Sequence, residues 1–395
     1  MLARLLPQGD STVMTHELMR MGCQTPHALL GERPGRLLCK CIGMPEAVAE
    51  VFLAWLRTHD QGCWSYSTPG ATAMTLDVLW SGPITLSDQL RVTQHPALQA
   101  LWTILEQALQ RQAGGVQQLT LGAHRLELGQ RPHIMGILNV TPDSFSDGGL
   151  YFQPDQAIKH AETMLAAGAD MIDVGGQSSR PGAVPVPPEV EQARVVPVIR
   201  EIVQRFNAVV SVDTYRARVA AAALDAGAVL VNDISALGFD AQMAPLIARR
   251  GAAVVLMHMQ GTPQTMQRAP TYHHVLDDVY RFLATRLQQA MDCGIPRQRI
   301  VLDPGFGFGK TVQHNLALLH DLEHLGMLGQ PLLVGTSRKS FLGHVLQRQV
   351  WDRLEGTLAT VLYAVLRGAT LVRVHEVAPI AQTIRLLSAL EQPLS

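Results

Sequence analysis

The feature that most constrains the fold is an alternation of strand-like and helix-like segments over the last two thirds of the chain. Short runs rich in valine, leucine and isoleucine occur at residues 133–140, 170–175, 208–213, 228–232, 252–257, 299–303, 331–335 and 370–374. Amphipathic helical patterns separate these runs, and several end with the glycine that commonly follows a helix. Eight such βα units in roughly 260 residues predict a closed parallel (β/α)8 TIM barrel rather than an open doubly wound sheet.

The barrel prediction has a consequence for function, because active sites of such barrels lie at the C-terminal ends of the strands. Polar side chains stand at that end of one predicted strand after another. They are Asn139, Asp173, Asp213, Asn232 and Asp233, His258, Asp303, Ser337 with Arg338 and Lys339, and Arg373 with His375 and Glu376. Any one of them can be explained as a helix N-cap. The series as a whole predicts a ligand site at this end of the barrel.

Composition excludes several classes of function. Lysine and arginine number 32 against 33 aspartate and glutamate, so no broad basic field is present to bind nucleic acid or an acidic membrane surface. We find no signal peptide and no apolar run long enough to span a bilayer, and we therefore expect a cytoplasmic protein. The five cysteines form no CxxC pair, which predicts reduced thiols rather than a disulfide framework or a zinc site.

The glycine-rich segment PGFGFGKT, residues 304–311, resembles a phosphate-binding loop at first sight. The Walker spacing requires glycine where Pro304 stands, and the dinucleotide fingerprint requires glycine where Lys310 stands. We therefore interpret the segment as a turn in which the backbone approaches a ligand closely, with Asp303 ahead of it.

The most specific stretch is MGILNVTPDSFSDGG, residues 135–149, a buried strand that leads into a loop rich in hydroxyls and carboxylates. The motifs GGQSSRPGA, SVDT, VNDI, DPGFGFGK, GTSRKSFLG and RVHEV follow it in this order. Together they resemble dihydropteroate synthases, from about residue 117 to the C-terminus. The resemblance implies a (β/α)8 barrel that joins p-aminobenzoate to the methylene carbon of 6-hydroxymethyl-7,8-dihydropterin diphosphate and releases diphosphate. It also implies Mg²⁺ and a homodimer.

The resemblance assigns one group of residues to the pterin. Carboxylates suit the amino and ring N–H groups at the edge of this heterocycle, and a planar guanidinium can lie flat against its face. The group comprises Asp213, Asn232 and Asp303 at the edge, Met257 against the face, Lys339 as a donor to the ring and Arg373 flat against it. Within this group, Asp213, Asp303, Lys339 and Arg373 are the predicted catalytic residues.

A second group is assigned to the diphosphate and to p-aminobenzoate. By resemblance, His375 and Asn139 bind the diphosphate, and Asn139 also lies near magnesium, which prefers hard oxygen ligands. The first and second loops are expected to close over p-aminobenzoate and to exclude water from a reactive cation. They act through Phe145, Ser178, Ser179, Arg180 and Pro181.

The second loop departs from the family pattern GGESTRPG at two positions. Gln177 stands in place of the acid and Ser179 in place of a threonine. Glutamine keeps a hydrogen-bonding carbonyl but loses a charge, and serine loses a methyl group. Sulfonamides imitate p-aminobenzoate, so we expect any effect on p-aminobenzoate affinity and on sulfonamide response to arise in this loop.

Three interpretations of different classes follow from the motifs. The first is the synthase. The second is a methyltetrahydrofolate-dependent methyltransferase, which has a similar pterin-binding barrel but no need of the NVTPDSFSDGG loop. The third is a non-catalytic pterin-binding paralogue, suggested by Gln177, although Asn139, Asp303, Lys339 and Arg373 are all retained.

The first part of the chain, residues 1–112, predicts a separate accessory domain. Helical patterns on either side of the strand-like TLDVLWSG indicate a small α/β or α+β domain whose role the sequence does not indicate. A structural or dimerising role is our first hypothesis and a regulatory one the second. Residues 117–395 then form the pterin-binding domain, with an N-terminal hairpin at 118–128 below the barrel at 133–395.

Overall fold

The computed structural model describes residues 2–5, 17, 36–59, 62–67, 75–83, 90, 93–113, 115–141 and 154–391. Phe145, predicted to close over p-aminobenzoate, lies outside the described residues. The chain divides into two compact units, one of Met1–Gly115 with Glu323–Gly329 and the other of Val116–Leu322 with Gln330–Ser395.

The second unit is built on a sheet of eight parallel strands. They are β7 (His133–Asn139), β8 (Met171–Gly175), β9 (Val209–Asp213), β10 (Leu230–Asp233), β11 (Ala253–Met257), β12 (Ile300–Asp303), β13 (Leu333–Val334) and β14 (Leu371–Val374). Their order in the sheet is β12-β11-β10-β9-β8-β7-β14-β13. A parallel bridge between Leu302 and Leu332 then joins the two ends of the sheet. The predicted (β/α)8 barrel is therefore confirmed, with β13 shorter than the predicted run.

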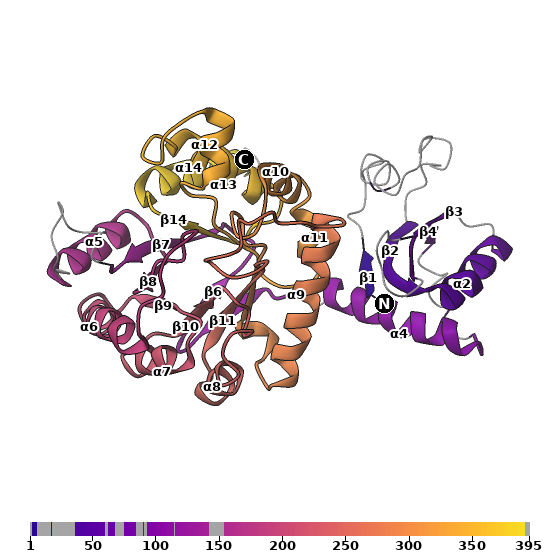
Figure 1. The fold of residues 1–395 in the computed structure, drawn as a ribbon, viewed down its shortest axis with the longest axis horizontal. Helices are drawn as coiled ribbons and strands as arrows, with labels where there is room; N and C mark the ends of the chain where they lie inside the picture. Colours follow the sequence, from indigo (N-terminus) through magenta and orange to yellow (C-terminus); the bar gives the residue numbers. More distant parts are fainter. Residues whose placement is uncertain are drawn as a thin grey trace. The chain divides into compact units, whose positions relative to one another are not determined.

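Helices follow the strands and cover the outside of the barrel (Figure 1). They are α5 (Pro154–Ala166), α6 (Pro188–Phe206), α7 (Ala217–Asp225), α8 (Met243–Arg250), α9 (Val275–Asp292), α10 (Val312–His320), α12 (Ser340–Leu346), α13 (Leu354–Leu366) and α14 (Val377–Glu391). Local signals set their ends. Thr311 and His314 form a capping box at the start of α10, and left-handed Gly251 ends α8. The helices hold the strands parallel, so that all the strands end on one side.

A short hairpin precedes the barrel. Its strands, β5 (Gln118–Leu121) and β6 (His124–Glu127), pair in antiparallel register. Leu119 and Leu121 are fully buried, and with Leu128 they pack against residues near the N-terminal ends of the barrel strands, such as Met135 and Met171. The hairpin therefore closes the end of the barrel opposite to the predicted site.

The first unit contains a four-stranded antiparallel sheet with strand order β1-β2-β4-β3. The strands are β1 (Leu2–Leu5), β2 (Arg36–Pro45), β3 (Gly62–Ser67) and β4 (Thr75–Pro83), and the unit also holds α2 (Glu46–Thr58), α4 (Pro96–Ala113) and the short α11 (Glu323–Gly326). Phe52 and Trp80 are buried at the centre of its own hydrophobic core, with their rings edge to face. The architecture is α+β, one of the two predicted classes.

Among the described residues, no helix is both long enough and apolar enough to cross a membrane.

We expect Leu119→Ala to destabilise the barrel strongly, because it leaves a cavity where the hairpin fills the barrel end. The expected loss is about 2–5 kcal/mol of unfolding free energy, seen as a lower urea midpoint. Arg125→Ala, on the exposed face of the same hairpin, is the matched control and should change the midpoint little. Equal midpoints for the two variants would contradict the sealing role of the hairpin.

Candidate active site

The register of the sheet brings three of the predicted residues to one level at the carboxyl ends of the strands. Asn139 of β7 is paired with Gly175 of β8, and Gly175 is paired with Asp213 of β9. Asp213 is in turn paired with Asn232 of β10. Because parallel strands without a register shift keep equivalent residues side by side, these polar groups surround one end of the barrel.

Arg373 of β14 forms hydrogen bonds to residues on two other strands at this end of the barrel. Its Nε donates to Asp173 Oδ2 over 2.7 Å, and its terminal NH2 donates to Asp213 Oδ2 over 2.8 Å. Burial by itself would lower the pKa of Arg373, but Asp173 and Asp213 raise it above its ordinary value. The guanidinium is therefore a permanent cation held between two carboxylates.

Asp173 lies at the centre of this network, although it is not among the predicted site residues. Its carboxylate is completely buried, and Oδ2 also accepts from Asn232 Nδ2 over 2.9 Å. Two buried acceptors, Asp173 Oδ1 and Asn232 Oδ1, have no hydrogen-bond partner among the described residues. Because buried polar atoms are nearly always paired, these two oxygens fit a ligand that supplies N–H donors. The polar residue inside the apolar run MIDVG was the sequence signal for Asp173.

Burial shifts the pKa values of the charged groups around this network. It raises the pKa of Asp213 to about 7, partly opposed by Arg373. It raises the pKa of Asp303 to about 6, partly opposed by the backbone N–H of Gly305 and by Lys339. Burial, with Arg373 nearby, also lowers the pKa of Lys339 to about 8. Strongly shifted groups of both signs in one place are typical of an active site.

An apolar cluster lies beside these charges. Met257 at the end of β11 packs with Ile234, Met266 and Phe308, and the partly buried Tyr215 joins them. Lys339 Nζ lies 4.2 Å from the centre of the Phe308 ring, within the range of a cation–π contact. The cluster offers a flat ligand an apolar surface next to a cation and a set of acceptors.

The predicted diphosphate side contains His375 in a neutral state. Ser337 Oγ lies 2.9 Å from His375 Nδ1, and the backbone N–H of His375 donates to the same hydroxyl. Burial, with Arg338 and Arg373 nearby, lowers the pKa of His375 to about 3. Arg338 is paired with Glu376. The positive charges that act on His375 are those of Arg338, Arg373, Lys339 and Arg180, of which Arg338 and Arg373 are also paired with carboxylates.

The predicted residues of the second loop are more exposed than the residues assigned to the pterin. Ser178, Arg180 and Pro181 are exposed and Ser179 is half-buried. The hydroxyl of Ser178 accepts from the backbone N–H of Arg180 at 3.3 Å. Gln177 Nε2 donates to the Tyr215 hydroxyl over 2.8 Å, which links this loop to the segment after β9. The structure therefore brings the pterin-side residues together and leaves the loop residues at the rim.

The glycine-rich turn after β12 is braced by Lys310. Its buried ammonium donates to Gly305 O at 2.9 Å and to Phe308 O at 3.1 Å, and it lies 2.9 Å from His258 Nδ1. Gly305 has a φ of +69°, and a Cβ there would lie 1.9 Å from the carbonyl oxygen of His258. The turn thus requires glycine for close backbone approach, as predicted, and Lys310 holds it closed.

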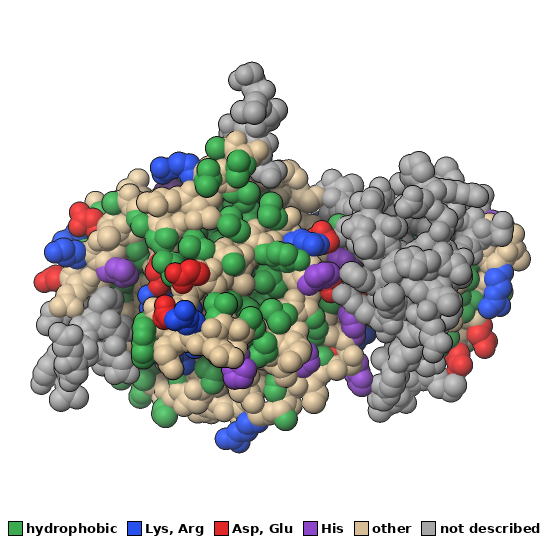
Figure 2. Space-filling model, turned by 90° about the horizontal axis from the view of Figure 1, so that it is seen from above, with side chains coloured by type: hydrophobic (Ala, Val, Ile, Leu, Met, Phe, Trp, Pro, Cys, Tyr) green, Lys and Arg blue, Asp and Glu red, His purple; other side chains and the backbone are tan. Residues whose placement is uncertain are grey.

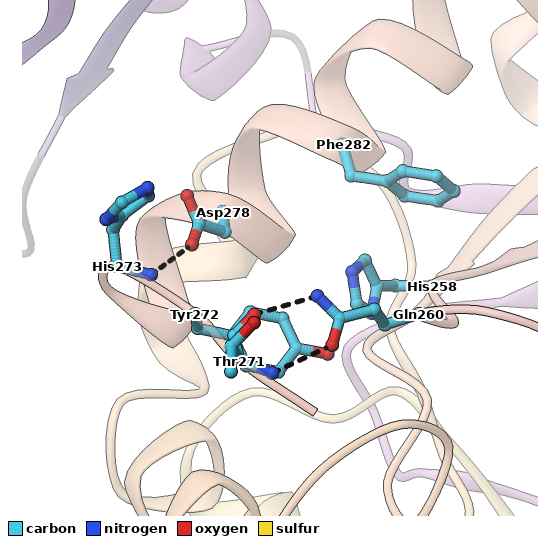
Figure 3. A pocket seen from close by; sticks show the side chains of 7 residues that line it. All are labelled: His258, Gln260, Thr271, Tyr272, His273, Asp278 and Phe282. Atoms are coloured by element: carbon cyan, nitrogen blue, oxygen red, sulfur yellow. Dashed lines mark hydrogen bonds between the residues drawn. The ribbon is translucent and has the colours of Figure 1, made fainter. Parts of the chain in front are cut away.

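A cavity of about 440 Å³ lies beside this turn, where α9 begins (Figure 3). It is lined by His258, Gln260, Thr271, Tyr272, His273, Asp278 and Phe282. Much of its polar lining is engaged within the protein. Gln260 exchanges two hydrogen bonds with the backbone of Thr271, and the Tyr272 hydroxyl donates to Gly309 O. Of the polar residues predicted at the strand ends, His258 lines this cavity, whereas none of the residues assigned to the pterin, the diphosphate or p-aminobenzoate is in its lining.

Comparison with known proteins identifies the family of the barrel. The family model of pterin binding enzymes matches residues 135–375. The dihydropteroate synthase of Escherichia coli K12 is 45% identical over 258 residues, which cover 65% of this chain and 91% of that protein. The chain belongs to the dihydropteroate synthases, a family of pterin-binding enzymes. The matched segment contains every predicted site residue, from Asn139 to His375.

Solved structures of dihydropteroate synthases share the barrel. The Yersinia pestis enzyme with a sulfonamide drug has a TM-score of 0.66 at 44% identity, covering 69% of this chain and 98% of that one. The Xanthomonas albilineans enzyme with 4-aminobenzoic acid has a TM-score of 0.67 at 41% identity, covering 71% and 100%. Each match covers nearly the whole of the other chain but only 69% or 71% of this dihydropteroate synthase.

We expect Lys310→Met to destabilise the protein, because it leaves the carbonyl of Phe308 without its donor and removes one of the two donors to the carbonyl of Gly305, which keeps the backbone N–H of Phe308. The expected cost is about 1–3 kcal/mol for the buried carbonyl left unpaired, measured as a lower urea midpoint. Lys159→Met, on the exposed face of α5, is the control and should be close to neutral. A Lys310→Met protein as stable as this control would show that the turn does not need its brace.

Proposed function

We propose that this dihydropteroate synthase joins p-aminobenzoate to the methylene carbon of 6-hydroxymethyl-7,8-dihydropterin diphosphate in folate biosynthesis. The products are 7,8-dihydropteroate and diphosphate. The observation that carries the proposal is the buried acceptor network at the strand ends, in which Asp173 Oδ1 and Asn232 Oδ1 have no described donor. A pterin edge, with its amino group and ring N–H groups, supplies such donors.

The pterin-side roles follow from the two kinds of surface that meet at the site. Asp213, Asn232 and Asp303 would accept from the pterin edge, while Met257 and the neighbouring apolar side chains contact a face of the ring. Lys339 Nζ, held over Phe308, would donate to the ring. Arg373 is already fixed by two carboxylates and can present its plane to the pterin without further loss of conformational freedom.

The chemical step separates charge, and the site is polarised to match. The bond from the methylene carbon to the diphosphate oxygen breaks, and both electrons leave with diphosphate. The cation left on the pterin methylene is stabilised by Asp213 and Asp303, while His375 and the cations around it face the departing anion. The amine nitrogen of p-aminobenzoate then forms the new bond to carbon and loses a proton. No strong general base is required, because a neutral aromatic amine is already nucleophilic.

The residues at the rim of the site would bind the second substrate, p-aminobenzoate. We assign p-aminobenzoate to the second loop, through Ser178, Ser179, Arg180 and Pro181, and to Phe145 of the first loop. Arg180 is exposed, and it forms no ion pair within the described part of the chain, so its charge is available to a carboxylate. Sulfonamides that imitate p-aminobenzoate would compete for the same rim.

The decisive experiment is diphosphate release by the purified protein with and without p-aminobenzoate. Release coupled to dihydropteroate formation supports the synthase. Methyl transfer from methyltetrahydrofolate without diphosphate release would favour the methyltransferase, and pterin binding without any turnover would favour the non-catalytic paralogue. The charge distribution around His375 favours the synthase, because only this reaction expels diphosphate.

We expect Lys339→Ala to lower kcat for dihydropteroate formation by roughly 10²–10³-fold, since it removes a preorganised donor from the reacting ring. Steady-state assay of diphosphate and dihydropteroate measures the change. Lys159→Ala, on the outside of α5, should retain the wild-type rate. Undiminished diphosphate release by Lys339→Ala would overturn the site assignment.

We further propose that magnesium takes part, held mainly by the substrate. Within the described residues, no three His, Cys, Asp or Glu side chains gather as a metal site. Mg²⁺ commonly binds through one or two protein oxygens together with phosphates and water, so a single amide oxygen fits it.

Asn139 supplies that oxygen, and no described residue hydrogen-bonds to its side chain. The missing side chain of Gly175 leaves room beside it, since a Cβ there would lie 3.5 Å from Asn139 Oδ1. Bound magnesium would neutralise part of the charge of the diphosphate.

We expect Asn139→Ala to raise the magnesium concentration needed for tight binding of the dihydropterin diphosphate. Loss of one oxygen contact to a charged group corresponds to roughly a tenfold shift. Titration of binding against magnesium, with EDTA as the metal-free reference, measures it. Asn207→Ala, at the C-terminal cap of α6, leaves the site untouched and serves as control. An unchanged magnesium titration in Asn139→Ala would remove Asn139 from the metal assignment.

We also propose a homodimer formed through the surface of α12 to α14. Large hydrophobic side chains are exposed on these helices and on the segment between α12 and α13, and hydrophobic side chains gather on this side of the molecule in Figure 2. They are Val345, Leu346, Val350, Trp351, Leu366, Leu386 and Leu390. Exposed patches of this kind commonly mark interaction surfaces.

We expect a double variant, Leu386→Glu with Leu390→Glu, to shift the protein from dimer to monomer in sedimentation equilibrium, because it places charges in the apolar contact. Val190→Glu on α6 is the control, since it alters an exposed hydrophobic residue away from α12 to α14. A double variant with the wild-type mass would place any dimer contact elsewhere.

We infer, finally, that the protein acts in the cytoplasm. Support comes from the cysteines, because Cys39, Cys41, Cys63 and Cys293 are all free thiols. Free thiols are typical of a reducing compartment.

A further inference from the structure

The side-chain amide of Gln177 has a determined orientation. The backbone N–H of Val186 approaches its Oε1 at 3.0 Å. A backbone N–H can only donate, so the oxygen of the amide must face Val186 and the nitrogen must face the other way. The nitrogen therefore faces the hydroxyl of Tyr215, 2.8 Å away.

This orientation decides what the Tyr215 hydroxyl can do. An amide nitrogen only donates, so the Tyr215 oxygen accepts in this bond and its own proton is not used. No described residue accepts that proton. A half-buried hydroxyl thus has an unused donor, and the donor exists because residue 177 is a glutamine. A carboxylate at this position would accept the proton instead.

The Tyr215 ring is held in place by apolar contacts next to Asp213. Tyr215 stands two residues after Asp213, and its ring packs against the apolar cluster that includes Met257 and Phe308. The ring meets Phe239 edge to face, with a centroid separation of 5.4 Å. The hydroxyl therefore lies between the pterin-side cluster and the second loop, where the proposed function places p-aminobenzoate.

We propose that Tyr215 is a specificity-determining residue, whose hydroxyl donates a hydrogen bond to the carboxylate of p-aminobenzoate under the direction of Gln177. This inference rests on the proposed function. A hydrogen bond to an ionised acceptor is roughly twice as strong as one to a neutral acceptor. The donor therefore favours the carboxylate of p-aminobenzoate over the less charged sulfonyl oxygens of a sulfonamide.

The test compares Tyr215→Phe with Gln177→Glu. The first removes the hydroxyl. The second keeps the Tyr215 hydroxyl and the bond from the backbone N–H of Val186, but it redirects the Tyr215 proton to the new carboxylate. Each variant should raise KM for p-aminobenzoate by roughly tenfold, the factor for one charge-assisted hydrogen bond. The KM for the dihydropterin diphosphate and kcat should stay within about twofold, and the inhibition constant of a sulfonamide should rise less than KM for p-aminobenzoate.

The double variant separates this proposal from a merely structural role. Both changes remove the same hydrogen bond, so Gln177→Glu with Tyr215→Phe should raise KM no further than either change alone. Tyr363→Phe on α13 is the control and should behave as wild type. The proposal is overturned if the wild-type protein makes dihydropteroate and Tyr215→Phe leaves KM for p-aminobenzoate unchanged, or if the two effects simply multiply. A wild-type protein that forms no dihydropteroate would overturn the proposed function itself.

Discussion

The candidate active site depends on one buried cation, the Arg373 guanidinium, which is shared between two carboxylates. Arg373 reaches from β14 across β7 to Asp173 on β8 and Asp213 on β9, so a single guanidinium connects several strand ends. Removing one partner of a buried ion pair typically costs about 3–5 kcal/mol, because it leaves a charge uncompensated. The closed sheet makes this arrangement possible, since it brings strands from opposite ends of the domain to adjacent places around the barrel. Asp173 Oδ1 and Asn232 Oδ1, which have no hydrogen-bond partner among the described residues, remain as acceptors for a ligand.

The rest of the site is organised by charge on either side of this cation. Burial raises the pKa values of Asp213 and Asp303, while it lowers that of His375, so each group is sensitive to the charge of a bound substrate. Acceptors gather where a pterin edge and a developing cation would lie. Cations gather near His375, where an anion would depart. Separation of charge in the reaction thus matches a separation already present in the protein.

The sequence motifs predicted much of this site, and the exceptions have physical reasons. Asp173 was placed in the series of polar strand ends but was assigned no role, because nothing near it in the sequence indicates that Arg373 and Asn232 bind its carboxylate. Lys310 was noted only as the residue that breaks a nucleotide-binding pattern, whereas its role as a brace depends on three groups in two separate loops. In the sequence, Gln177 was interpreted mainly as the loss of the negative charge that the family pattern has at this position. Its effect on Tyr215 depends on the direction of an amide, which a backbone donor at Val186 determines.

The sequence by itself determined the barrel, the order of its strands and the polar residue that ends most of them, because the period of apolar residues and the rule that parallel strands end on one side do not depend on distant contacts. Only the tertiary structure decided which of those polar atoms are already paired and which remain open. The partners of Arg373 stand 160 and 200 residues away along the chain. Hydrogen bonds between such distant residues have no local signal, since they exist only after the sheet has closed.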